Sequence, residues 1–140
     1  MCCPLYENKR RHIPFLSTLG MKKSVFILFM AVLLSSCDQW KAERLVSSFL
    51  KENLKEEYDF SKKYNDLDST FNITDSIVGV MRMREDKNEK FNTPIKYVEG
   101  APTRPLMIER VRLKENDSTT YTMTFYLDKE LTRVVAFKEN

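Results

Sequence analysis

The side chain with the clearest chemistry in this sequence is the thiol of Cys37. It stands directly after Ser35 and Ser36, at the end of an uninterrupted apolar run, Val25 to Leu34. A thiol is the most nucleophilic group that the chain offers near neutral pH, and two small residues precede it. Cys37 is therefore the first residue to consider for covalent chemistry.

The segment from Met21 to Cys37 resembles the signal peptide of bacterial lipoproteins. Lys22 and Lys23 form a basic start, and the apolar run is far shorter than the roughly 20 residues that span a bilayer. Leu34-Ser35-Ser36-Cys37 then matches the lipobox of that family. The resemblance implies that the Cys37 thiol receives a diacylglycerol, that cleavage between Ser36 and Cys37 removes residues 21–36, and that acyl chains hold the protein on a membrane. The alternative is a buried Cys at the end of a core strand.

Residues 1–20 precede a second Met with its own basic start. They contain Cys2, Cys3 and His12 and show no apolar periodicity. We expect translation to start at Met21, so that residues 1–20 are an upstream extension outside the true protein. The alternatives are an extended basic region of the signal and a redox or metal-binding pair at Cys2-Cys3.

The composition after Cys37 excludes several classes of function. Residues 38–140 contain 18 Lys and Arg against 19 Asp and Glu, a nearly neutral balance without the basic surface that nucleic-acid binding needs. They contain no Cys and no His, which excludes a disulfide, a Cys or His nucleophile and a Cys/His zinc site. We therefore expect no catalytic residues, no metal site and no cofactor.

The remaining candidates for acid/base chemistry are carboxylates. Glu56, Glu57 and Asp59 lie close together in the sequence, but glycoside chemistry needs two carboxylates facing each other across a cleft. Asp59, Asp66 and Asp68 lack the glycine and the terminal glutamate of a calcium-binding EF-hand loop. The solvated end of a helix explains the first group better, and a solvated strand and turn explain the second.

Three serines match a modification pattern of Bacteroides-type envelope proteins. Ser69, Ser76 and Ser118 each follow an Asp and precede Thr or Ile, which resembles the O-glycosylation sequence of those bacteria. Asp-Ser is also common in turns and at helix N-termini. We expect O-glycosylation at one or more of the three.

The first element of the mature region is an amphipathic helix. Apolar residues at three- and four-residue spacing predict it over Gln39–Glu57, with Asp38 as the N-cap. We expect its apolar face to pack on a sheet, and the alternative is a helix lying in the membrane interface. Trp40, three residues from Cys37, suits the level of the lipid headgroups.

A strand and a second helix should follow. The strand is expected near Ser69–Ile73, and the helix over Thr74–Asn88, with Ile77, Val80 and Met81 on one face. The alternative for the second segment is a strand, Ile77–Met83.

The last third of the chain predicts a sheet. Strands are expected over Leu106–Lys114, Thr119–Leu127 and Leu131–Lys138, joined by short turns, and Ile95–Val98 could add an edge strand. The alternation in the middle strand turns Phe125 inward and Thr124 outward. The fold class is therefore α+β, with one or two helices packed on one face of a three- to four-stranded antiparallel meander sheet, as a single domain over residues 37–140.

This mature region resembles small lipoproteins of Bacteroides-type bacteria. The similarity is carried by Phe49–Leu54, Leu67–Ser69, Thr124–Asp128 and Val134–Asn140. It implies an anchored domain and brings no catalytic residue with it. The order of elements is also similar to cystatin-like and NTF2-like domains and to the small lipoprotein of the outer-membrane barrel-assembly machinery, which are likenesses of fold alone.

These observations predict a lipid-anchored cell-envelope protein that binds or scaffolds and is not an enzyme. Its expected partners are the membrane, through acyl chains on Cys37, and an envelope protein. With little tether and no acidic run after Cys37, we expect it at the outer membrane, facing the periplasm. The alternatives are a small-ligand carrier or enzyme on a cystatin- or NTF2-like frame, with a groove lined by Tyr97, Tyr121 and Tyr126, and an inhibitor of an envelope hydrolase.

Overall fold

The computed structural model describes residues 37–115 and 118–140, which belong to one compact unit. The expected upstream extension, the signal peptide and Ser36 lie outside the described residues. The described elements are two helices and five strands: a helix over residues 37–53, β1 (Ser61–Tyr64), β2 (Asp68–Thr70), α2 (Asp75–Glu85), β3 (Leu106–Lys114), β4 (Thr120–Leu127) and β5 (Val134–Glu139).

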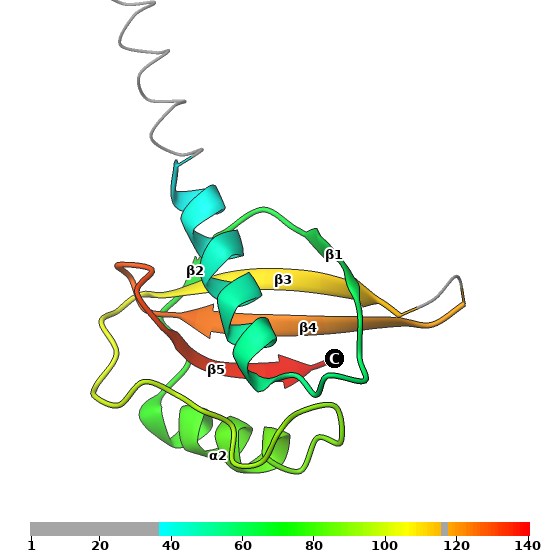
Figure 1. Cartoon of the computed structure of the whole chain (residues 1–140). Helices are drawn as coiled ribbons and strands as arrows, with labels where there is room; N and C mark the ends of the chain where they lie inside the picture. Colours follow the sequence, from blue (N-terminus) through cyan, green and yellow to red (C-terminus); the bar gives the residue numbers. More distant parts are fainter. Residues whose placement is uncertain (1–36, 116–117) are drawn as a thin grey trace, which may run out of the picture. The chain divides into compact units, whose positions relative to one another are not determined.

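The strands form one antiparallel sheet with β3 and β4 at its centre (Figure 1). The hairpin β3–β4 is the longest pairing, from Met107 opposite Leu127 to Lys114 opposite Thr120, and β5 continues the meander on the far side of β4. On the other side of β3, β1 pairs with its second half and β2 with its first half. The predicted α+β class is confirmed, with a sheet slightly larger than expected.

The two helices cover opposite faces of this sheet. Phe49 of the first helix packs against Phe125 and Phe137, at ring-centroid distances of 6.1 and 5.8 Å. Met81 of α2 packs in a separate cluster that includes Tyr126, the residue that follows Phe125 in β4. Because neighbouring residues in a strand point to opposite faces, the central sheet is enclosed on both sides. The expectation that one face carries both helices is wrong.

Local capping explains why the segment after β2 is a helix and not a strand. The Thr74 side chain accepts a hydrogen bond from the backbone N–H of Ile77 at 3.4 Å. Asp75 lies in the first turn, and Arg82 and Arg84 lie in the last, so the charges complement the helix dipole. The predicted helix over Thr74–Asn88 is confirmed in type, and α2 ends at Glu85.

The first helix differs from its predicted bounds at both ends. It already includes residues 37 and 38, so Asp38 is a helical residue and not the N-cap. It ends at residue 53, before the expected Glu57, because Leu54 forms an isolated bridge with Phe91 and the Lys55 N–H donates to the Lys90 carbonyl at 3.1 Å. A tertiary contact therefore ends the helix where its propensity would have continued.

The strand predictions were right for the meander and incomplete elsewhere. β1 was missed, β2 is a short form of the expected Ser69–Ile73 strand, and Ile95–Val98 is not a strand. β5 starts at Val134, later than the predicted Leu131, because Leu131 has a positive φ of 56° in the preceding turn. A single residue in the left-handed region breaks the extended conformation.

Replacing Phe125 by Ala should cost about 3–5 kcal/mol of unfolding free energy, because it empties the centre of the aromatic cluster. Thr124→Ala should cost about 1 kcal/mol, since it removes the hydroxyl that accepts a hydrogen bond from Asn140 Nδ2 at 2.9 Å. Urea denaturation followed by circular dichroism measures both. Equal costs would contradict the register of β4.

Candidate functional site

Cys37 is the first residue that the structure describes, and it is exposed. It belongs to the helix over residues 37–53. Any group attached to its sulfur would therefore be joined to the first helical turn, with no flexible segment between the attachment point and the fold. The sulfur of Cys37 is accessible for the predicted modification. Ser36, on the other side of the predicted cleavage site, lies outside the described residues.

Trp40 lies in the same part of the helix and is 57% exposed. The Arg44 guanidinium stacks over its ring at 5.2 Å from the centroid. Such a cation–π contact stabilises an exposed indole modestly. Cys37 and Trp40 are therefore both exposed at the start of this helix.

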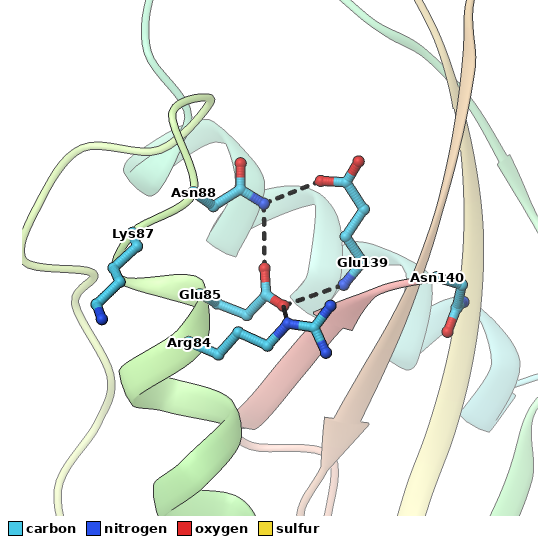
Figure 2. A pocket seen from close by; sticks show the side chains of 6 residues that line it. All are labelled: Arg84, Glu85, Lys87, Asn88, Glu139 and Asn140. Atoms are coloured by element: carbon cyan, nitrogen blue, oxygen red, sulfur yellow. Dashed lines mark hydrogen bonds and ion pairs between the residues drawn. The ribbon is translucent and has the colours of Figure 1, made fainter.

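A polar hollow of about 360 Å³ lies between the end of α2 and the end of β5 (Figure 2). Its centre is the side-chain amide of Asn88, which donates to Glu85 Oε2 at 3.0 Å and to Glu139 Oε2 at 2.9 Å. The Glu139 N–H donates to the other oxygen of Glu85 at 3.3 Å, and Lys90 Nζ lies 3.0 Å from Glu139. The hollow is lined by Arg84, Glu85, Lys87, Asn88, Glu139 and Asn140.

The contacts in this hollow are those of a structural network. The buried carboxylate of Glu85 is held by an amide, a backbone N–H and, at 4.0 Å, the Arg84 guanidinium. Glu139 is paired with a lysine. The oxygens of both carboxylates are engaged by donors, so the network joins α2 to β5. Sequence reasoning did not single out these residues.

The carboxylates that the sequence did single out lie elsewhere. Glu56 and Asp59 line a second hollow of about 270 Å³ beside Tyr58 and Phe60. Glu57 is exposed outside it. Among the described residues, no group of three or more His, Cys, Asp or Glu side chains could hold a metal ion.

The three tyrosines proposed for a groove do not share one. Tyr97 packs on Phe49, and the Arg82 guanidinium lies over its ring at 4.4 Å. Tyr121 contacts Phe60 on the same side of the sheet, whereas Tyr126 is buried in the α2 cluster on the other side.

The serines of the glycosylation pattern are all exposed. Ser69 lies in β2 at the edge of the sheet, Ser76 in the first turn of α2, and Ser118 in the turn before β4. Each is accessible to a modifying enzyme from outside the fold.

The outer surface of α2 exposes large apolar side chains. Ile77, Val80 and Met83 are exposed on it, and so is Phe71 just before the helix. The sequence placed Ile77, Val80 and Met81 on one face; the structure buries Val78 and Met81 and exposes Ile77 and Val80. The outer face of an ordinary surface helix is mainly polar, and this face of α2 is apolar instead.

No protein-family model, curated protein or solved structure matches this chain. Within the part that the structure describes, no helix is long and apolar enough to cross a membrane.

Two valines of α2 test which face of the helix is buried. Val78 is 8% exposed and Val80 is 60% exposed. Val78→Ala should cost about 1–3 kcal/mol of unfolding free energy through the cavity it leaves, and Val80→Ala no more than about 0.5 kcal/mol. Urea denaturation of the two variants compares their unfolding free energies. A larger cost at Val80 would mean that the helix buries the face that carries Val80.

Asn88→Ala should cost about 1–3 kcal/mol, because it leaves a buried oxygen of Glu85 without its donor. Asn72→Ala, the same change at an exposed position, should change the unfolding free energy by no more than about 0.5 kcal/mol. Thermal denaturation of both variants measures the difference. Similar melting temperatures would mean that the amide bridge contributes little.

Proposed function

We propose that this protein is a lipid-anchored module of the bacterial cell envelope that works by binding a protein partner. The observation that carries the proposal is the lipobox, Leu34-Ser35-Ser36-Cys37, followed at once by a folded helix. Acyl chains on Cys37 would hold the domain close to its membrane, and the exposed indole of Trp40 would meet the same surface. The leaflet we favour is the inner one of the outer membrane, facing the periplasm.

Binding is favoured over catalysis by how the interior is filled. The space between the first helix and the sheet is occupied by an aromatic cluster that contains Phe49, Phe91, Phe125 and Phe137. A small-ligand carrier or an enzyme on a frame of this kind needs a deep, partly apolar pocket. The hollow beside Glu85 is open and lined by polar residues, and the smaller one beside Tyr58 is lined by lysines and carboxylates as well as apolar groups. The absence of a deep apolar pocket among the described hollows supports the binding class.

The surface we favour for the partner is the exposed apolar face of α2. In Figure 1 the start of the first helix and α2 lie at opposite ends of the unit. A domain anchored through Cys37 would therefore present Ile77, Val80 and Met83 away from the membrane. Exposed apolar groups gathered on one helix are a common feature of protein-binding surfaces.

The anchor is tested by labelling a bacterial host with an alkyne fatty acid and detecting the label on the purified protein. The wild-type chain should carry the label, and Cys37→Ala should lose it and leave the membrane fraction. The control replaces Cys2 and Cys3 by Ala, which removes the other cysteines of the chain and should leave labelling unchanged. Label retained on Cys37→Ala would refute the anchor.

A further inference from the structure

Glu109 is a carboxylic acid in the hydrophobic core. It lies in the middle of β3 and is 0% exposed. The neighbours on its face of the strand, Met107 and Val111, belong to the cluster beneath the first helix, and its partner across the hairpin is Phe125. A charge in such a place is costly unless a counter-charge or a full set of hydrogen bonds balances it.

The hydrogen bonds at Glu109 are incomplete. The side-chain amide of Gln39 lies 3.3 Å from Glu109 Oε2, but the same nitrogen also lies 2.9 Å from Glu43 Oε1 and 3.0 Å from the Asn65 carbonyl. Three acceptors therefore compete for the two hydrogens of one amide. Glu109 Oε1 has no hydrogen-bond partner among the described residues.

The charges around Glu109 further disfavour its ionised form. The ionisable groups that act on it are Glu43 in the first helix and Asp66 in the loop after β1, and both are acidic. The phenol of Tyr64 in β1 is nearby, and its own pKa is raised by burial, so it stays neutral. Burial and then the charge of Glu43 raise the pKa of Glu109 to about 7, against the smaller lowering by the Gln39 hydrogen bond.

Gln39 connects this carboxyl to the beginning of the fold. Its side-chain oxygen accepts a hydrogen bond from the Leu67 N–H at 2.7 Å. One side chain, two residues after Cys37, therefore joins the first helical turn, the β1–β2 loop and β3. A change in the charge of Glu109 acts on all three at once.

We propose that Glu109 is a proton-controlled latch on the first helical turn and the β1–β2 loop. When its carboxyl is protonated, the Gln39 amide is free to bond Glu43 and Asn65, and the turn and the loop are closed over the core. When the carboxyl releases its proton to solvent, the new negative charge is repelled by Glu43 and Asp66 and draws water in. The turn and the loop then open while the rest of the sheet stays folded.

The direction of the pH dependence follows from linkage. The folded state holds the proton up to about pH 7, whereas an unfolded glutamate releases it near 4.5. Between these values the folded state binds more protons, so the stabilisation of the closed latch is complete at lower pH and falls as the pH rises through this window. If the anchor proposed above is present, opening frees the first turn beside the lipid and lets the domain move away from the membrane; this consequence alone rests on the proposed function.

The latch is tested by hydrogen–deuterium exchange of the full chain in detergent at pH 5.5 and pH 8, corrected for the intrinsic exchange rate. In the wild type, peptides covering the β1–β2 loop should lose protection about tenfold or more at the higher pH, while β4 should not change. Glu109→Gln should keep the loop protected at both values. Glu89→Gln, a change at an exposed position, should behave as the wild type.

Equal loss of protection in the wild type and Glu109→Gln would overturn the proposal. If Glu109→Gln fails to fold, Glu43→Gln decides the matter: removing this neighbouring charge should move the opening to lower pH, and an unchanged midpoint would also overturn the proposal. The same measurement on Cys37→Ala separates the two proposals. An unlipidated chain that still opens with pH would leave the latch standing even where the anchor fails.

Discussion

The contact on which the rest of this structure depends is the insertion of Phe49 into the aromatic cluster of the sheet. Its ring meets Phe125, Phe137 and Tyr97, and Phe137 in turn lies 4.7 Å from Phe91. These residues come from the first helix, the loop after α2 and two strands, so one packing arrangement fixes segments far apart in the sequence. Aromatic rings bury large areas and favour tilted and edge contacts, which explains how a small domain obtains a single well-defined core.

The same helix also organises the long loop between α2 and β3. The buried side chain of Asn53 donates to the Phe49 carbonyl at 3.0 Å and accepts from the Lys96 N–H at 2.7 Å. Asp86, at the end of α2, accepts from the Ile95 N–H at 3.0 Å. These two side chains accept hydrogen bonds from backbone N–H groups that would otherwise bond a neighbouring β-strand. The segment around Ile95 is therefore held in place without being a strand.

Elements with local signals were predictable from the sequence, and those fixed by tertiary contacts were not. The cap at Thr74 and the alternation of β4 are local, and both are found in the structure. β1 has two lysines and no apolar alternation, so only its pairing with β3 defines it. In α2 the apolar residues occur nearly all round the helix, and the bond from Arg82 Nε to the Val135 carbonyl at 2.8 Å is among the contacts that orient it. Glu109 had a readable signal, because period two places it in phase with Met107 and Val111, but the sequence analysis did not single it out.

The positions that break the rules of folding are where function is most reasonably sought in this molecule. Most of the interior between the first helix and the sheet follows those rules, since its aromatic cluster is apolar and buried. Glu109, a core carboxyl without a counter-charge, and the exposed apolar face of α2 do not. The buried carboxyl lowers stability relative to a glutamine at position 109. The apolar face of α2 lowers solubility relative to polar residues at the same positions. Real sequences keep such departures mainly where function requires them. Glu109 is bonded by Gln39 of the first helical turn, and α2 lies at the opposite end of the unit from the start of the first helix (Figure 1). The aromatic cluster around Phe49 joins the first helix to the sheet, so it can hold these two ends at a fixed separation, which is what the anchored binding module proposed above would need from its fold.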